Sequence, residues 1–409
     1  MENSLDDKEI LQIAKEALSN YKLCDHCLGR LFAKVETGFT NKERGQLIIK
    51  NLKKNNKTET KDCWLCGGLC NQILHFADLL TESLKEYEYN TFLVGSKVEE
   101  DILQREDELF KSTGSEYFES IKNELNREIG KILEKNLEQE VDFNNPDIMA
   151  VIDTAFDVVN LQIVSLYIYG RYKKFRRGIP QTRWFCKICQ GKGCKKCNYT
   201  GKLYGASVEE LIAKRFLELT KGEDESFHGC GREDVDVRML GNGRPFILEI
   251  KNPMTRSLDL SKLEKEINSL NKEIIEVNNL HFSNKNEVAK LKDLGPKKIY
   301  RVVLKGEGPL NNEKLKKVAL SLHGAKIGQF TPSRVAHRRA NMVREKHIYN
   351  CRIESVDGAM ATLTLEAESG TYIKELVSGD DGRTKPNISE MIGVPCKVTE
   401  LDVIEIKGE

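Results

Sequence analysis

The stretch "GREDVDVRMLGNGRPFILEIKNP", residues 231–253, decides the fold because its pattern predicts two neighbouring strands of one sheet. Asp234 and Asp236 alternate with valines, as in a half-buried strand, and "GNGRP" is typical of a hairpin turn. The second strand then carries Glu249 and Lys251. Followed by further strands and helices, such a hairpin predicts an α+β unit built on a mainly antiparallel sheet. Its acidic groups belong either to a metal site or to a lone nucleophile.

The sequence downstream extends this sheet. Alternating apolar residues predict strands in "KKIYRVVLKGEG", "HIYNCRIESVDG", "MATLTLEAES" and "CKVTELDVIEI". A helix is expected upstream in "SVEELIAKRFLELT". We therefore expect residues 205–409 to form the catalytic domain.

The rest of the chain divides into two further parts, because 409 residues exceed the roughly 250–300 that one core holds. Residues 1–75 carry two cysteine pairs and predict a metal-binding N-terminal module. In residues 76–204, helical patterns alternate with short β-rich runs, as in an α/β accessory domain. Within it, "IMAVIDTAFDVVNLQIVSLYIYGRY" predicts a strand followed by a helix.

Composition narrows the class of protein. The chain is 39% hydrophobic and 31% charged, and its acidic, helix-patterned start is unlike a signal or transit peptide. No apolar run approaches the roughly 18–20 residues of a membrane span. We therefore expect a cytoplasmic protein.

Charge is segregated along the chain although the net charge is only +1. Residues 171–202 hold eleven Lys or Arg and no acid, and "TPSRVAHRR" opens a second basic segment at 331–346. Residues 97–110 are acidic and predict a solvated helical face. Local basic fields of this kind are typical of surfaces that bind phosphate.

The first four paired cysteines, Cys24, Cys27, Cys63 and Cys66, form two CxxC motifs. Two such pairs can close a tetrahedral Zn²⁺ site that holds a small subdomain together. Cys70 competes for the fourth position. Buried free thiols are the alternative, and the paired spacing argues against it.

A tighter set follows in "CKICQGKGCKKC", with Cys186, Cys189, Cys194 and Cys197. This string looks like one half of the zinc-binding repeat of DnaJ-type chaperones. A site made of four thiolates leaves no open position for water, so both zinc ions are expected to be structural. The lysines around this second site make it a candidate for contact with a nucleic-acid backbone.

A metal-dependent nuclease is one interpretation of the opening stretch. Asp234 or Asp236 with Glu249 would hold Mg²⁺, and Lys251 would help to position the attacking water. The pattern is short, however, and such matches arise often by chance. Glu249 and Lys251 are equally well explained as outward residues beside a buried Ile250.

A second interpretation uses residues from the whole domain. "GRED" with Asp234 resembles the Gly-Arg-x-Asp loop of TruA-type pseudouridine synthases, and "KKIYRVVL" places Tyr300 on a strand. "GTYIKEL", residues 370–376, is similar to the Gly-Thr-Tyr-Ile-Arg-x-Leu motif of the TruB type. Together with "GDDGRTKPNISEMIG" and the N-terminal CxxC pairs, they resemble the archaeal and eukaryotic "Pus-ten" family of tRNA pseudouridine synthases. The likeness covers residues 205–409 with little interruption, and the zinc knuckle points to the archaeal branch.

This resemblance implies a fold, an activity and a substrate. Residues 76–204 would be a THUMP-containing region, and the substrate would be the T arm of tRNA. Uridine 55 is the family's target, with uridine 54 as well in some archaeal members. The base is detached from C1′, turned and rejoined through C5, without a catalytic cofactor. The family also implies a monomer without an obligatory protein partner.

The resemblance also implies roles for individual residues. Asp234 would be the nucleophile and Lys374 its cationic partner, although the TruB type has Arg at that position and a bidentate clamp is lost here. Tyr300 would stack on the uracil and can carry a proton. Around the pocket the likeness places Arg232, Arg383, Tyr372 and Ile388, and on the RNA backbone Arg334, Arg338 and Arg339. Asp236 would be structural, pairing with Arg238 or capping the turn.

Two rival functions remain open at this stage. A Mg²⁺-dependent ribonuclease would lose activity in a chelator. A non-catalytic tRNA-binding protein would be unaffected by loss of Asp234. Neither explains "GTYIKEL" together with Tyr300.

Overall fold

The computed structural model describes residues 4–53 and 60–408, without the side chains of Thr60, His337 and Arg338. The chain divides into two compact units: residues 1–164 with 252–256, and residues 165–251 with 257–409. Each has its own hydrophobic core. Within the described residues, none of the helices has the length and apolar character needed to span a membrane.

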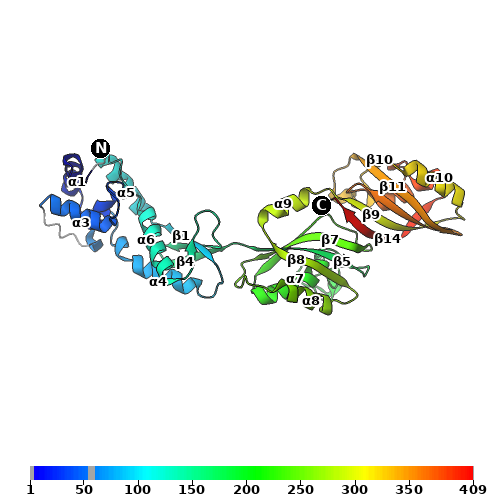
Figure 1. Ribbon diagram of the computed structural model, residues 1–409, viewed down its shortest axis with the longest axis horizontal. Helices are drawn as coiled ribbons and strands as arrows, with labels where there is room; N and C mark the ends of the chain where they lie inside the picture. The colour runs from blue at the N-terminus through cyan, green and yellow to red at the C-terminus, as the bar shows by residue number, and fades with distance from the viewer. Residues whose placement is uncertain (1–3, 54–59, 409) are drawn as a thin grey trace. The chain divides into compact units, whose positions relative to one another are not determined.

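The first unit combines a helical N-terminal part with a four-stranded sheet. Its helices are α1 (Lys8–Asn20), α2 (Asp25–Arg30), α3 (Asn41–Asn51), η1 (Thr60–Asp62), η2 (Leu69–Asn71), α4 (Ile73–Leu84), α5 (Glu100–Thr113) and α6 (Ile121–Asn136). The strands β1 (Thr91–Lys97), β2 (Glu140–Val141), β3 (Ile148–Asp153) and β4 (Val158–Ile163) take the order β2-β1-β3-β4. Helices α4 and α6 cover this mixed sheet (Figure 1).

The second unit is built on one large sheet, which has ten strands in the described part of the chain. They are β5 (Leu166–Lys174), β6 (Asp224–Gly229), β7 (Arg238–Lys251), β8 (Ile275–Ser283), β9 (Lys297–Gly306), β10 (Ala325–Phe330), β11 (Val343–Asp357), β12 (Met360–Ala367), β13 (Thr384–Lys385) and β14 (Cys396–Lys407). Their order is β13-β10-β11-β12-β9-β14-β7-β5-β8, with β6 also on β7. All pairs are antiparallel except β14 with β7, so the mainly antiparallel α+β prediction is confirmed.

Helices cover both ends of this sheet. They are α7 (Val208–Thr220), α8 (Leu260–Leu270), α9 (Lys285–Asp293), α10 (Asn312–Leu322), α11 (Ile373–Ser378) and α12 (Ile388–Ile392), with short η3 (Lys195–Cys197) and η4 (Ser333–Arg338). Helix α7 lies by β6 and β7, α8 lies by β8, and α10 lies by β10 and β11 (Figure 1). Helix α7 begins where its sequence predicts, because Ser207 and Glu210 form a capping box.

The predicted hairpin in residues 231–253 is wrong. Residues 231–237 form a loop, and β7 then runs unbroken through "GNGRP". Gly241 and Gly243 have positive φ, and a Cβ on Gly241 would lie 1.8 Å from the Ile404 carbonyl oxygen. These glycines let the strand bend from β14 to β5 without leaving the sheet. The catalytic aspartate candidate therefore stands on a loop and not on a strand.

Two other segments also differ from expectation. The run predicted as a strand and a helix forms three strands, β3, β4 and β5. Strand β5 pairs with β7, so residues 165–204, expected in the accessory region, lie in the larger unit. The acidic helix α5 is not wholly solvated, because Glu106 is buried and pairs with Arg30.

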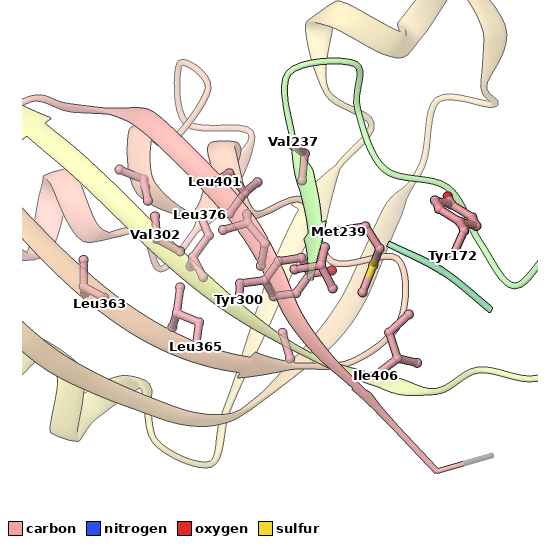
Figure 2. Packing of buried hydrophobic residues seen from close by; sticks show 14 of the residues in the cluster. Tyr172, Val237, Met239, Tyr300, Val302, Leu363, Leu365, Leu376, Leu401 and Ile406 are labelled. Atoms are coloured by element: carbon pink, nitrogen blue, oxygen red, sulfur yellow. The ribbon is translucent and has the colours of Figure 1, made fainter. Parts of the chain in front are cut away.

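Tyr300 lies at the edge of the core of the larger unit. Its ring packs among buried side chains from β7, β9, β12, β14 and α11, several of which are labelled in Figure 2. Only 8% of Tyr300 is exposed. The sheet therefore holds this ring in place, and Tyr300 also lines a pocket of the larger unit.

Candidate active site

A pocket of about 300 Å³ collects most of the motifs singled out in the sequence. Its lining comes from the loop 231–234, from β9, from the segment 334–339 and from the "SGTYIK" segment 369–374. Leu401 and Val403 of β14 supply an apolar side. Residues far apart in the chain thus meet around one hollow.

Asp234 lies at this pocket between two cations. Arg334 Nη1 is 3.0 Å from Asp234 Oδ2, and Lys374 Nζ is 3.4 Å from the same oxygen. Lys374 is nearer to Asp236, at 2.8 Å from both carboxylate oxygens. Asp236 therefore pairs with Lys374, whereas Arg238 pairs with Asp402. Burial raises the pKa of Asp236, but its hydrogen bonds with Lys374 lower that pKa further, so that it lies below its ordinary value.

Arg334 is itself held in place by a buried carboxylate. Its Nε donates to Glu375 Oε1 at 2.6 Å, and Glu375 is only 4% exposed. Burial lowers the pKa of Arg334, but the hydrogen bond to Glu375 outweighs this, so that the pKa lies above its ordinary value. Glu375 is thus the anchor that aims Arg334 at Asp234.

A buried network fixes the loop that carries Asp234. Glu233 accepts from Arg244 Nε at 2.8 Å and from the Tyr172 hydroxyl at 2.9 Å, and Lys174 Nζ lies 3.6 Å away. Lys174 also donates to the Asp234 carbonyl oxygen at 3.3 Å. Because every member of this network is buried, the loop is bound on its inner side and turns Asp234 outward.

The "GTYIK" segment is held by a buried glutamine. Gln329 donates to the Tyr372 carbonyl oxygen at 2.9 Å and accepts from the Tyr372 amide at 2.8 Å. Gln329 is fully buried. Lys374, two residues on, is presented to Asp234 from this fixed backbone.

Two ionisable groups at the floor of the pocket are strongly perturbed. Burial raises the pKa of the Tyr300 phenol to about 12; Arg244 opposes the rise and the Asp234 charge adds to it. Burial, with Arg244 nearby, lowers the pKa of Lys298 to about 8. Tyr300 therefore keeps its proton at neutral pH, and Lys298 can change charge near it.

Not every predicted site residue reaches this pocket. Arg232, Tyr372 and Arg339 line it. Ile388 is fully buried in the core at the start of α12. Arg383 stacks on Phe330 at 5.1 Å from the ring centre and donates to the Thr331 carbonyl. Neither Ile388 nor Arg383 is among the lining residues. The Arg338 side chain lies outside the part that the structure describes.

The nuclease residues do not come together among the described residues. Glu249 binds His228 at 3.0 Å and the Tyr167 hydroxyl at 3.0 Å. Lys251 pairs with Asp224 at 2.8 Å. Glu249 and Lys251 do not line the pocket that holds Asp234. No cation site formed by Asp234, Asp236 and Glu249 is present in the described part of the chain.

Both cysteine tetrads are assembled. The ligand atoms of Cys24, Cys27, Cys63 and Cys66, and separately those of Cys186, Cys189, Cys194 and Cys197, lie within 4.8 Å of one another. The first set is fully buried, and the second is mostly half-exposed. Four converging thiols fit a structural zinc ion. Cys70 stands beside the first set and groups with His26 and Glu124 instead.

Several residues around the pocket escaped sequence reasoning. Glu375, Lys298 and Arg244 lie inside the quoted segments "GTYIKEL", "KKIYRVVL" and "GNGRP" but were given no role there, and Gln329 lies outside them. Their roles depend on partners distant in the chain. For the first three, their place in these segments was the one available signal.

Comparison with known proteins identifies the family. The family model "Pus10, C-terminal" matches residues 167–407, more than half of the chain. The chain belongs to the Pus10 family. A second family model, "Pus10 THUMP domain, archaeal", matches residues 76–153. The chain is thus a pseudouridine synthase, an isomerase with a THUMP domain, as the sequence resemblance predicts.

Two curated relatives are similar over nearly their whole length. The tRNA pseudouridine synthase Pus10 of Methanothermobacter marburgensis is 42% identical over 95% of this chain and 96% of its own. The same enzyme from Methanocaldococcus jannaschii is 41% identical over 96% and 93%. A crystal structure of a Cbf5–Nop10–Gar1 complex has a TM-score of 0.32 and 17% identity, and covers 49% of this chain and 45% of that one.

Proposed function

We propose that this Pus10-family protein is a tRNA pseudouridine synthase that converts uridine 55 of the T arm, and uridine 54 as well, with Asp234 as the nucleophile. The observation that carries the proposal is the pocket in which Asp234, Tyr300 and Lys374 meet. The names of its relatives support tRNA as the substrate.

The chemistry follows from these groups. The uridine leaves the base stack, at a cost of a few kcal/mol, and enters the pocket. Asp234 acts at the ribose–base centre while the bond from C1′ to N1 breaks. The base turns, C5 bonds to C1′, and the proton that C5 loses is balanced by one gained at N1. No oxidant or reductant is needed.

The surrounding residues hold this arrangement. Arg334 and Lys374 orient the Asp234 carboxylate, and they also balance its charge. The protonated Tyr300 offers its ring edge to the base and a hydroxyl that can carry the proton. Arg232 and Arg339 contact phosphates. Tyr372 walls the pocket, while Arg383 and Ile388 support it from outside.

The remaining parts are proposed to bind and stabilise. Each tetrad holds one zinc ion without a catalytic role, and residues 76–204 bind tRNA through the THUMP domain and the basic knuckle at 186–197. Residues 1–75 form the zinc-stapled N-terminal module. We propose that the enzyme acts in the cytoplasm as a monomer.

An unmodified tRNA transcript tests the proposal. Purified protein receives roughly 1 mM EDTA just before the reaction, a brief exposure that spares tightly held zinc, and pseudouridine is mapped by position. We expect product at 55 and 54 of the T arm despite the chelator. Cleavage that appears only when Mg²⁺ replaces EDTA would favour a nuclease, and bound but unmodified tRNA would favour a binding protein.

Metal analysis of the purified protein tests the zinc sites. We expect two zinc ions per chain, because two separate tetrads converge. Cys27→Ser should leave one ion and destabilise the first unit, since Cys27 is buried in its core. Cys194→Ser should also leave one ion, without that loss. Cys70→Ala and Cys351→Ala, which remove thiols outside the tetrads, should keep both ions; iron in place of zinc would contradict the assignment.

A further inference from the structure

A second hollow also has Asp234 in its lining. It measures about 230 Å³ and shares five lining residues with the first pocket: Arg232, Glu233, Asp234, Arg334 and Lys374. Its other wall comes from Trp184 and the residues just before it. Two hollows therefore meet at one carboxylate, and the chemistry described above uses only the first.

The wall of this second hollow has the groups that hold a nucleotide. Trp184 is half-buried, and the guanidinium carbon of Arg232 lies 5.9 Å from its ring centre. Tyr204 meets the same ring edge-on at 5.6 Å. An indole face supplies a stacking platform for any base, and a neighbouring guanidinium suits the phosphate attached to it.

The position of Trp184 relative to Asp234 is fixed from two sides. Gln181, which is 5% exposed, donates to the Tyr172 hydroxyl at 2.8 Å and to the Gly231 carbonyl at 3.0 Å. On the other side, the Leu203 amide donates to the Trp184 carbonyl at 2.9 Å. The segment before Trp184 is thus tied to the catalytic loop, and Trp184 itself is tied to the base of the cysteine knuckle.

We propose that this hollow binds the nucleotide next to the target uridine, with its base stacked on Trp184 and the intervening phosphate on Arg232. The inference rests on the proposed function. Two consecutive nucleotides would then lie on either side of Asp234, so that the neighbour fixes which uridine reaches the carboxylate. The knuckle gains a function by the same argument, because it positions the stacking residue.

A double-mutant cycle, which combines substitutions of Trp184 with abasic sites in the RNA, tests this subsite. T-arm hairpins carry an abasic site at either neighbour of the target, and binding and single-turnover rates are measured with wild type, Trp184→Ala and Trp184→Phe. We expect Trp184→Ala to weaken binding of the intact hairpin about 5- to 100-fold. Trp184→Phe should recover most of it. One abasic site should weaken wild type similarly and leave Trp184→Ala unaffected.

Controls separate this subsite from a general loss. Leu320→Ala removes an apolar side chain that is 76% exposed on α10, outside the hollow and outside the segments proposed to bind tRNA, so it should bind normally. Zinc content and thermal unfolding should match wild type in all variants. If the losses from Trp184→Ala and from each abasic site simply multiply, the stacking proposal is overturned. Absence of pseudouridine in wild type would instead overturn the proposed function, while the binding cycle would still report on the hollow.

Discussion

Replacing Asp234 by Asn is expected to lower the single-turnover rate of pseudouridine formation by about 10³-fold or more, since a group that acts at the reacting bond is removed. Asn keeps the size of the side chain and can still accept from Arg334. RNA binding should stay within a few-fold of wild type, because the phosphate-binding arginines are unchanged. The rate is measured with enzyme in excess over a T-arm hairpin, and binding is measured on the same preparation.

Asp236→Asn is the matched control. Asp236 stands two residues away on the same loop, shares Lys374 with Asp234, and has a side chain that is 66% exposed. We expect it to keep most of the activity. Equal losses in both variants would mean that the loop needs both charges, and a larger loss at Asp236 would exchange their roles.

The second large effect concerns stability. Glu233→Gln leaves Arg244 and Lys174 buried without their carboxylate, and breaking a buried pair in this way costs about 3–5 kcal/mol. The melting temperature of the larger unit should fall by about 10 °C. Amide exchange in residues 231–237 and β7, followed by mass spectrometry, reports on this unit separately from the first.

Tyr172→Phe is the control for that variant. It removes a hydroxyl that donates to the same carboxylate, and we expect a smaller loss of about 1–3 kcal/mol because the ion pairs remain. A loss as large as that of Glu233→Gln would show that the hydroxyl, and not the charge, is decisive.

The stability difference should also depend on pH. Burial raises the pKa of Glu233, but the charges of Arg244 and Lys174 outweigh this, so that the pKa lies below its ordinary value. Its contribution to stability is therefore complete above the unfolded pKa of about 4.3 and is lost as the pH falls through the lower folded value. Wild type and Glu233→Gln should differ by a constant amount at neutral pH and converge below about pH 4.

Local patterns predicted β9, β11, β12 and β14, because each alternates apolar and polar residues and one face of the sheet is buried. The short strands β10 and β13 were not predicted. They also predicted both tetrads, since CxxC spacing is itself the geometry of the site. The same alternation misled at residues 231–237. There Glu233 is drawn inward by Arg244 and Lys174, and no local pattern reports such distant partners.

The site, like the fold, contains features that local motifs predicted and features that depend on partners distant in the chain. Asp234, Tyr300 and Lys374 were brought together by family motifs, and the structure places all three at one pocket. Arg334 was expected on the phosphate-binding surface but pairs with Asp234 and Glu375. Its segment reads as a basic run, and its buried acidic partner lies 41 residues away. Such pairings depend on tertiary contacts and stay invisible in a single sequence.

The register of β14 against β7 determines how Tyr300 is placed relative to Asp234. Strand β14 pairs with β7 at only two positions, Asp402 with Arg238 and Val403 with Met239. A slip of one residue there would shift Tyr300 against Asp234 by about 3.3 Å, several times the roughly 0.5 Å that a reacting group can be misplaced. Asp402, 2% exposed, binds Arg238 at 2.6 Å and Arg177 at 2.7 Å. These two arginines therefore hold β14 and β7 in register, and the accuracy of the chemistry depends on two salt bridges that lie outside the pocket lining.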